Sequence, residues 1–339
     1  MSSEQRVKSK AFVCNLSRLP TKISFIKFPA LCTANIPLKT HFLFFSLFSF
    51  LFSLFLSCAS ISPVTSERER PESFPTIESV TPQWQPFVLG IDYFHGKIAE
   101  PRLEFWALQV DLTSPDIRIT VRGGAENSAE GGGQTLSTRV SSFVRDNNLI
   151  AGINALPFYP VSGREREPRI NVGIVIADGV MVSPAVPGYD ALVFYTDGRA
   201  AIVSQSSIRS TDNIKNAVGG FFQILTDGDP ALRAHSKARH PRSAAGISTD
   251  GRFLYLLVID GRRAGSIGST EKETALLLRA LGSAEGINFD GGGSSALALR
   301  FSNSRVRVVN TPIHNRIRGW ERAVAGCLGI YKKYLPGVH

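Results

Sequence analysis

The chain has 339 residues, a hydrophobic fraction of 43% and a charged fraction of 19%, which is the composition of a globular protein and excludes a largely disordered one. Its formal charge of +10 is concentrated in residues 1–57, where seven Lys or Arg accompany one acid, so the rest of the chain carries only +4. That remainder has no Lys/Arg run, zinc-finger spacing or aromatic RNA-binding motif, and we therefore expect no nucleic-acid partner.

The first recognisable element is an apolar run at residues 42–56, with a basic flank before it and small residues after it. The run is shorter than the roughly 20 residues that a membrane-spanning helix needs, and it fits the apolar part of a secretion signal. Residues 54–58 resemble a relaxed lipoprotein box, with Phe55 where Leu is usual, which predicts lipidation of Cys58. An uncleaved signal anchor and ordinary signal cleavage are the alternatives. We expect an exported protein anchored at a membrane of the cell envelope, with residues 1–57 as its signal or leader segment.

The segment after the leader, residues 58–86, is rich in Ser, Thr, Pro and charge, which is typical of a flexible tether. We place the folded domain at residues 87–334. If Cys58 carries lipid, Cys327 stands alone in the mature protein, so no disulfide is expected. Cys327 lies in the apolar run 323–330, which predicts a buried structural thiol and not a nucleophile.

Within the domain, short apolar runs alternate with Gly, Asp and Asn turns, which indicates strands, and helical patterns are fewer. We therefore predict an α+β fold: a single domain with a mixed β-sheet and few helices, containing a β-α-β crossover at 253–290. The glycines at 131–133 lie in a polar stretch with no strand before them and are interpreted as a flexible loop. The expected strands are 105–112, 117–121, 149–153, 172–177, 191–195, 200–203, 253–259, 286–289, 296–301 and 327–331, and the expected helices are 136–146 and 271–281.

The predicted crossover brings two carboxylates to one edge. A buried strand at 253–259 ends in Asp260, and a second at 286–289 ends in Asp290; the helix between them begins with a capping-box pattern that includes Glu273. Short connections between strand, helix and strand predict parallel strands, so both Asp side chains and the helix N-terminus lie at the same edge of the sheet. If the strands are neighbours, about 5 Å apart, the two carboxylates have the spacing of a glycosidase acid pair.

Asp290 opens the run Asp-Gly-Gly-Gly-Ser-Ser. The glycines at 291–293 let backbone N–H groups approach an anion, and Ser294 adds a hydroxyl donor. Each feature also has a simpler interpretation: a tight turn for the glycines, a turn residue for Asp260 and a helix cap for Glu273. Their combination at one predicted edge favours a ligand site.

Three motifs occur in a fixed order: His-Pro-Arg-Ser-Ala-Ala-Gly-Ile at 240–247, Val-Ile-Asp-Gly-Arg at 258–262 and Asn-Phe-Asp-Gly-Gly-Gly-Ser-Ser at 288–295. This order resembles the phosphodiester glycosidase family. Further segments at 151–154 with Phe158, at 171–179 and at 310–324 extend the resemblance over roughly residues 87–332. The sequence departs from the family pattern at residues 155–157, which come before the aromatic residues Phe158 and Tyr159. This difference concerns the shape of the sugar pocket.

The resemblance implies hydrolysis of the bond between a sugar's anomeric carbon and phosphate, with a cell-envelope glycan as the expected substrate. Such a site needs cationic groups for the phosphodiester and carboxylates around the sugar. The candidate catalytic residues are Asp260, Asp290 and, in second place, Glu273. The candidate substrate-binding residues are Asn154 for the sugar, Arg242, Arg262 and the glycine nest Gly291, Gly292 and Gly293 for the phosphate, and also Ser294 and Arg322.

Two other functions stay open. A non-catalytic envelope lipoprotein would hold a phosphosugar on the same fold without cutting it, and both central Asp residues argue against it. A metal-dependent phosphodiesterase needs His/Asp clusters with ligand spacing, and the five histidines after residue 58 form none. His240 is predicted to be structural or to lie at the edge of the site. No metal and no cofactor is expected.

Overall fold

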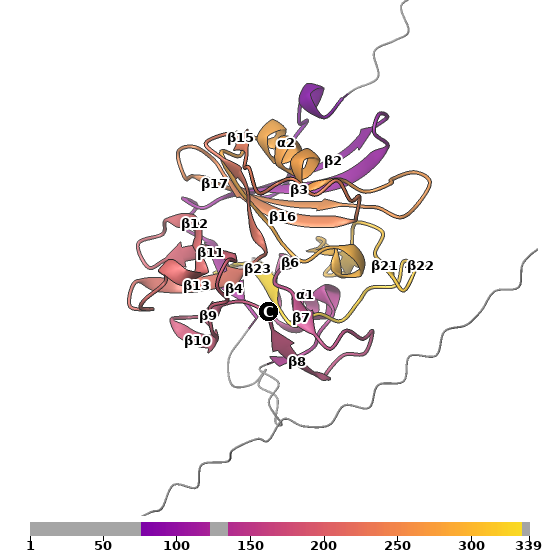
Figure 1. The fold of residues 1–339 in the computed structure, drawn as a ribbon. Coiled ribbons are helices and arrows are strands. Elements are labelled where there is room, and N and C mark those ends of the chain that lie inside the picture. Colours follow the sequence, from indigo (N-terminus) through magenta and orange to yellow (C-terminus); the bar gives the residue numbers. More distant parts are fainter. Residues whose placement is uncertain (1–75, 123–134, 334–339) are drawn as a thin grey trace, which may run out of the picture. The chain divides into compact units, whose positions relative to one another are not determined.

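The computed structural model of the protein describes residues 76–122 and 135–333 (Figure 1). The leader, Cys58, most of the predicted tether and the glycines at 131–133 lie outside the described residues. Within the described ranges, no helix has both the length and the apolar character needed to cross a membrane. The α-helices described are α1 (Val140–Asp146) and α2 (Glu271–Leu281), with 3-10 turns η1 (Ile77–Ser79), η3 (Gln205–Ser207) and η4 (Gly292–Ser294).

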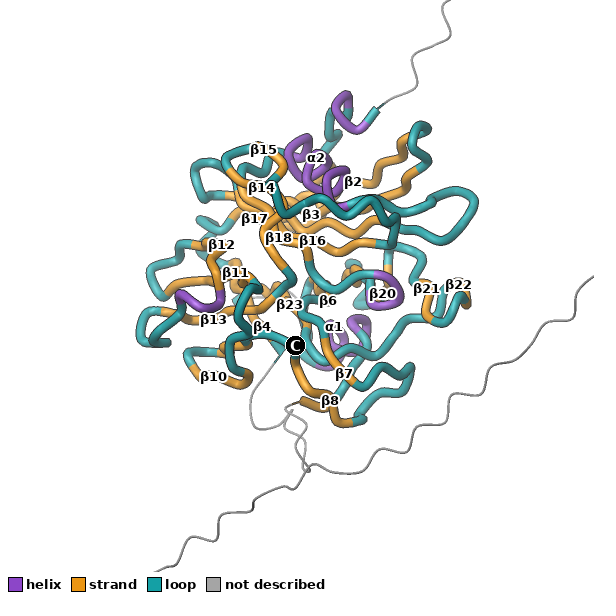
Figure 2. The backbone as a smooth tube through the Cα atoms, in the orientation of Figure 1, coloured by secondary structure: helices purple, strands orange, loops and turns teal. Residues whose placement is uncertain are grey.

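The sheet that carries the site has eight strands in the order β1-β2-β3-β17-β16-β18-β14-β15 (Figures 1 and 2). They are β1 (Gln85–Val88), β2 (Ile91–Ile98), β3 (Leu103–Asp111), β14 (Phe222–Thr226), β15 (Asp229–Pro230), β16 (Arg242–Ile247), β17 (Phe253–Ile259) and β18 (Glu285–Asn288). The strand β17 is a continuous apolar run because both faces of the sheet are covered there. Its even-numbered residues from 254 to 258 belong to one buried cluster and its odd-numbered residues from 255 to 259 to another.

The other strands form smaller sheets. One has five strands in the order β20 (Val306–Val308), β19 (Leu297–Arg300), β6 (Ala151–Asn154), β23 (Cys327–Lys332) and β4 (Ile117–Val121). A second has the order β10 (Val180–Ser183), β9 (Val175–Ala177), β13 (Ile214–Gly219), β11 (Asp190–Tyr195) and β12 (Ala200–Ser204). The remaining strands form a three-stranded sheet in the order β5 (Thr135–Leu136), β8 (Pro168–Asn171) and β7 (Phe158–Tyr159), and a hairpin of β21 (Ile313–His314) and β22 (Ile317–Arg318).

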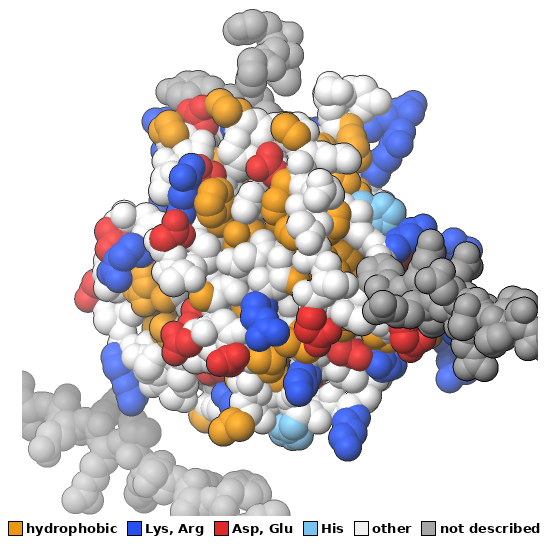
Figure 3. Space-filling model, turned by 90° about the horizontal axis from the view of Figure 1, so that it is seen from above, with side chains coloured by type: hydrophobic (Ala, Val, Ile, Leu, Met, Phe, Trp, Pro, Cys, Tyr) orange, Lys and Arg blue, Asp and Glu red, His pale blue; other side chains and the backbone are white. Residues whose placement is uncertain are grey.

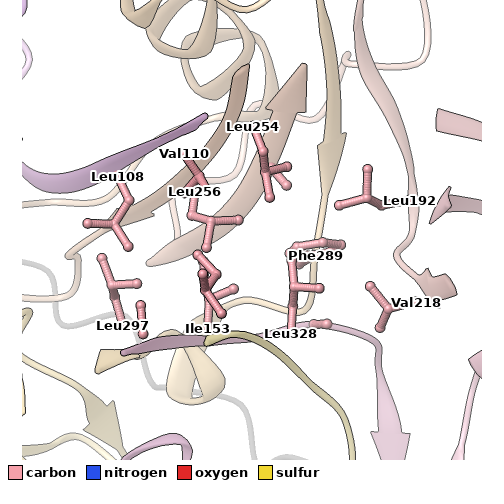
Figure 4. Close-up of a cluster of buried hydrophobic side chains, with 14 of the residues drawn as sticks. Leu108, Val110, Ile153, Leu192, Val218, Leu254, Leu256, Phe289, Leu297 and Leu328 are labelled. Carbon is pink, nitrogen blue, oxygen red and sulfur yellow. The ribbon is translucent and has the colours of Figure 1, made fainter. Parts of the chain in front are cut away.

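The main core lies between the eight-stranded sheet and the sheet of β6, β19 and β23. Leu108 and Leu256 of the first sheet face Ile153, Leu297 and Leu328 of the second (Figure 4), and all five side chains are fully buried. The helix α2 covers the opposite face of the eight-stranded sheet, where its leucines form a second cluster (Figure 1). Packing on both faces therefore fixes the central strands β17, β16 and β18 and the loops that follow them.

The N-terminal turn η1 is part of this folded unit. Ile77 is 4% exposed and packs in the cluster beside α2, although the sequence placed residues 58–86 in the tether. On the α2 side of the molecule, seen in Figure 3, acidic and basic side chains are interspersed.

The expected mixed pairing is not found among the strands that the structure describes, although β17 and β18 run parallel to each other because each is antiparallel to the strand between them. Every pairing between strands in the described residues is antiparallel. The strands β17 and β18 are not neighbours, because β16 lies between them and pairs with both. The strand β16 was not predicted because its Ala, Ala and Gly have low strand propensity. Those small residues serve close packing: a Cβ on Gly246 would lie 2.2 Å from Ser283 Oγ.

The predicted helix 271–281 is confirmed to the residue. Thr270 accepts a hydrogen bond from the Glu273 N–H, the capping box is complete, and Gly282 ends the helix with a φ of 115°. The helix α1 is shorter than its expected range of 136–146, because Leu136 is the end of β5 and pairs with Pro168. The bounds of α2 are predicted more accurately than those of α1 because the sequence of α2 carries strong signals at both ends.

The predicted buried thiol is confirmed. Cys327 on β23 is a free cysteine with no exposed surface, and burial raises its pKa to about 12. A thiol held neutral at physiological pH is a poor nucleophile, which is consistent with a structural role.

Candidate active site

The loops that follow β17 and β18 reach the same edge of the sheet, on the two sides of Pro241, the residue before β16. A Cβ on Gly261 would lie 2.7 Å from Pro241 N, and a Cβ on Gly291 would lie 2.7 Å from Pro241 O. The N–H of Gly292 donates to the same carbonyl at 2.8 Å. Glycine is needed at both positions because the backbone of Pro241 passes so closely.

A cavity of about 370 Å³ opens at this edge. It lies beside the first turn of α2 and is lined by side chains or backbone from five segments: Phe221, Phe222, Ser236, His240, Arg242, Arg262, Glu271, Asn288, Gly291 and Gly292. Its volume is at the lower end of the range of small-molecule sites. The cavity is thus lined by two arginines, one carboxylate and the glycine loop.

Arg242 is held in the cavity wall by backbone carbonyls. It is 7% exposed, and its Nε and Nη2 donate to Ser269 O and Ala238 O, each at 3.2 Å. Its Nη1 lies 3.8 Å from Glu271 Oε1, while Glu271 Oε2 accepts the Ser236 N–H at 3.1 Å. Burial lowers the pKa of Arg242 and the charge of Glu271 opposes that effect. The guanidinium of Arg242 is thus engaged by two carbonyls and faces Glu271.

Arg262 is exposed and lies over the glycine loop. Its Nη2 would be 2.9 Å from a Cβ on Gly292, and within the described residues its guanidinium has no hydrogen-bond or ion-pair partner. Its φ of 59° is in the left-handed region, which non-glycine residues seldom adopt. His240 lies in the same wall; burial, together with the charges of Arg242 and Arg262, lowers its pKa, so it is neutral at pH 7. The mouth of the cavity therefore carries an unpaired cation.

Asp290 adjoins the cavity through Gly291. Burial raises its pKa to about 6, while the Ser294 hydroxyl and the charge of Arg322 act in the opposite direction. Arg322 donates to Ser294 Oγ at 3.1 Å and to His314 Nδ1 at 3.0 Å, and its Nη2 would be 2.5 Å from a Cβ on Gly293. The carboxyl group of Asp290 thus sits beside a cation in a partly buried position and ionises near neutral pH.

Asn154 lies beneath Asp290 and not in the cavity. Its Nδ2 donates to Asp290 O at 2.6 Å, and its Oδ1 accepts from Ser243 Oγ at 2.6 Å and Ala296 N at 3.1 Å. The side chain is 1% exposed. Asn154 was predicted to contact the sugar. In the structure its side chain instead holds the backbone of Asp290 in place.

Asp260 belongs to an internal ion-pair network. It is 1% exposed; its Oδ2 accepts from Arg263 at 2.7 Å, and its Oδ1 accepts from Asn310 at 3.1 Å and from Thr311 N at 3.0 Å. Arg263 also pairs with Glu104. Burial raises the pKa of Asp260 and Arg263 lowers it. Neither Asp260 nor Asp290 lines the cavity, but Asp290 adjoins it through Gly291, whereas the oxygens of Asp260 are occupied by Arg263, Asn310 and Thr311.

Glu273 is likewise engaged elsewhere. Arg239 donates to its two carboxylate oxygens at 2.7 and 2.5 Å, and Glu273 Oε2 accepts the Thr270 N–H at 2.9 Å. It is absent from the cavity lining. Of the predicted residues, the structure brings together Arg242, Arg262, Asp290, Gly291, Gly292, Gly293, Ser294 and Arg322, and it places Asn154, Asp260 and Glu273 around them.

Several lining residues, chiefly Glu271 and Asn288, were not among the predicted site residues. A signal for Asn288 was present: it is a polar residue inside the apolar strand that ends at Asp290. Glu271 was hidden because acids are common in the first turn of any helix. In the part of the chain that the structure describes, no group of three or more His, Cys, Asp and Glu side chains is arranged to hold a metal ion.

The chain is similar to known proteins in sequence and in fold. The model of the phosphodiester glycosidase family matches residues 147–331, more than half of the chain, and the protein belongs to this family. In sequence it is similar to the SPbeta prophage-derived uncharacterized protein YomE of Bacillus subtilis (strain 168), with 26% identity over 259 residues. That match covers 73% of this chain and 37% of the longer relative.

Two solved structures share the fold. The catalytic domain of zebrafish N-acetylglucosamine-1-phosphodiester alpha-N-acetylglucosaminidase, auto-inhibited by its pro-peptide, aligns with a TM-score of 0.56 and 18% identity over 80% of this chain and 95% of that domain. A hypothetical protein from Synechocystis aligns with a TM-score of 0.51 and 14% identity over 75% of this chain and 65% of that one. At such identities the likeness shows the fold alone.

Proposed function

We propose that this protein hydrolyses a sugar-1-phosphodiester by cleaving the bond between the anomeric carbon and the phosphate oxygen. The observation that carries the proposal is the position of Asp290, which lies within reach of the charge of Arg322 and is joined through Gly291 to a cavity whose lining includes the unpaired Arg262. Membership of the family supports the same reaction.

In this proposal the phosphodiester lies at the glycine loop. Arg262 and Arg322 neutralise its charge. The N–H of Gly292 donates to Pro241 O, so within the loop the N–H of Gly293 is the group proposed to donate to a phosphate oxygen. The C–O bond breaks with its electron pair passing to the phosphate oxygen, and a water molecule adds hydroxide to the anomeric carbon and releases a proton. Phosphate is a good leaving group, so no strong general acid is required. The ionised carboxylate of Asp290 stabilises the cationic sugar or activates the water.

The experiment is hydrolysis in ¹⁸O-water of the methyl phosphodiesters of α-glucose 1-phosphate and N-acetyl-α-glucosamine 1-phosphate. We expect ¹⁸O in the released sugar and none in the methyl phosphate, with phosphorus NMR and mass spectrometry as readouts. Label in the phosphate product would show P–O cleavage and a phosphodiesterase. Binding without turnover of either compound would instead support a phosphosugar-binding protein.

We also propose export, with Cys58 lipidated and a cell-envelope glycan as the substrate. The support is the apolar run at 42–56 followed by Cys58 and a polar segment. The test is expression of the full chain and of Cys58→Ala in a bacterial host fed radiolabelled palmitate, with Cys327→Ala as the matched control. Loss of label only in Cys58→Ala is expected, and equal labelling of all three proteins would refute lipidation.

A further inference from the structure

The cavity contains two acceptors that lack a full set of donors. Asn288 is 1% exposed and its Oδ1 has no hydrogen-bond partner within the described residues. Glu271 is 8% exposed, and its Oε1 has only the 3.8 Å contact with Arg242. A buried acceptor without a donor costs about 1–3 kcal/mol. Both residues line the cavity, where a ligand can supply the missing donors.

A phosphodiester cannot supply them. At neutral pH it carries only acceptor oxygens and a negative charge, which the carboxylate of Glu271 repels. The missing donors must be hydroxyl or amide N–H groups, and these belong to the sugar part of a sugar-1-phosphodiester. The phosphate part then has its own cation in Arg262, which lies on the exposed side of the same cavity.

We propose that Glu271 and Asn288 select the sugar, each by accepting a hydrogen bond from a hydroxyl or amide group on its ring. This inference rests on the proposed function and adds the substrate class: an uncharged glycosyl group with two free donors. Because Arg242 already faces Glu271 and two carbonyls, the inner wall carries no unpaired charge for a carboxylate on the sugar. Phe221 and Phe222 provide apolar surface for the C–H face of the ring.

The test compares each substrate with its monodeoxyfluoro analogues, because fluorine keeps the size of a hydroxyl and cannot donate. The substrate is whichever of the two methyl phosphodiesters is hydrolysed faster. In the unmodified enzyme we expect kcat/KM to fall at least ~10-fold for fluorine at two ring positions, since a site built for a donor rejects an analogue that lacks it. In Asn288→Ala the loss at one of these positions should shrink below about 3-fold, and in Glu271→Ala the loss at the other should shrink likewise.

A structural role for these residues would lower kcat/KM for all analogues by the same factor, and that uniform result would overturn the proposal. The matched control is Ser283→Ala, which removes another buried oxygen without a partner that lies outside the cavity, and it should leave the fluorine pattern unchanged. If Glu271→Ala folds poorly, Glu271→Gln takes its place. This variant keeps an acceptor oxygen without the charge, so it should retain the fluorine pattern.

If neither phosphodiester is hydrolysed, the proposed reaction fails for these substrates and the inference is judged by binding alone. Calorimetric titration then uses methyl α-glucoside and methyl N-acetyl-α-glucosaminide, which carry no phosphate. Binding that weakens at least ~10-fold in both Ala variants but not in Ser283→Ala supports sugar recognition by Glu271 and Asn288. Absence of binding, or equal binding by all variants, refutes it.

Discussion

The side-chain amide of Asn154 donates a hydrogen bond to the main-chain carbonyl of Asp290 at 2.6 Å, across 136 positions of sequence. Asn154 is the last residue of β6, in the sheet on the far side of the core, whereas Asp290 follows β18 in the eight-stranded sheet. The bond therefore ties the reactive edge of one sheet to the end of a strand in another. A second tie runs the same way, because the N–H of Asp290 donates to Ala155 O at 2.7 Å.

Asn154→Ala should destabilise the protein by at least about 2 kcal/mol, because it leaves three groups without a partner and each buried unsatisfied group costs about 1–3 kcal/mol. The groups are Asp290 O, the Ser243 hydroxyl and the Ala296 N–H. Urea denaturation measures the loss. Asn213→Ala, in an exposed turn, is the control and should change stability by less than about 0.5 kcal/mol. A stable Asn154→Ala protein with altered KM alone would instead favour a direct sugar contact.

Asp290→Asn should lose at least ~10²-fold in kcat/KM, the scale of one acid–base group. For the unmodified enzyme we expect kcat/KM to rise with pH through an inflection near the Asp290 pKa of about 6, because the ionised form is the active one. The residual activity of the Asn variant should lack that inflection. A profile that falls as pH rises through 6 would mean that the protonated carboxyl is required, and an unchanged profile would remove Asp290 from the mechanism.

The same carboxyl should affect stability with a definite sign. Its pKa is about 6 in the folded protein and about 3.9 in an unfolded chain, so the fold favours the protonated form. This contribution is fully present below about pH 4 and is lost as pH rises through 6. The side chain of the Asp290→Asn protein cannot ionise. The melting temperature of this variant minus that of the unmodified protein should therefore increase between pH 4.5 and pH 7.5. A constant difference across that window would contradict the raised pKa.

Asp260→Asn should act mainly on stability. It leaves the charge of Arg263 half-compensated in a buried site, and breaking a buried ion pair costs about 3–5 kcal/mol. Denaturant unfolding checks this, with the exposed Asp250→Asn as control. For the folded fraction we expect kcat within about 10-fold of normal, since one acid–base group accounts for ~10²-fold or more. A loss of turnover as large as that of Asp290→Asn, without a loss of stability, would restore Asp260 as a catalytic residue.

Arg262→Asn should raise KM for a sugar-1-phosphodiester, and raise Ki for inorganic phosphate, by at least ~10-fold, with little change in kcat. The loss of one charge-assisted contact to the phosphate accounts for this size. Asn tolerates the left-handed φ of 59°, so the loop keeps its shape. Arg316→Asn is a matched control, because Arg316 is also exposed with a φ of 63° and does not line the cavity. Equal effects of the two changes would indicate general electrostatic attraction and not a contact.

The sequence was informative where the signals are local. The helix α2 could be predicted to the residue because its cap, apolar stripe and terminal glycine all act within a few positions. The loop from Asp290 to Ser294 could be found because a run of three glycines is rare and has a specific backbone use. The buried Cys327 followed from the apolar run around it.

What could not be predicted depends on partners distant in sequence. The strand β16 inserts between β17 and β18, and nothing within residues 253–290 indicates a third strand. Asp260 and Glu273 look like catalytic acids until Arg263 and Arg239 are seen to occupy their oxygens. Glu271 enters the cavity only because α2 lies against the sheet at that position. Which acid is free and which is paired is a property of tertiary contacts.

The three glycines of the loop are closed to side chains by three different groups: the Pro241 carbonyl, the Arg262 guanidinium and the Arg322 guanidinium. Mutation at this edge is therefore directional. A descendant that lost Arg322 would leave the space beside Gly293 open, and any side chain later acquired there would occupy the volume that Arg322 Nη2 needs, 2.5 Å away. Reversion of the arginine alone would then leave its guanidinium displaced from Gly293. Loss of anion binding in this loop would need one change, whereas full recovery would need two, the return of the glycine and the return of the arginine.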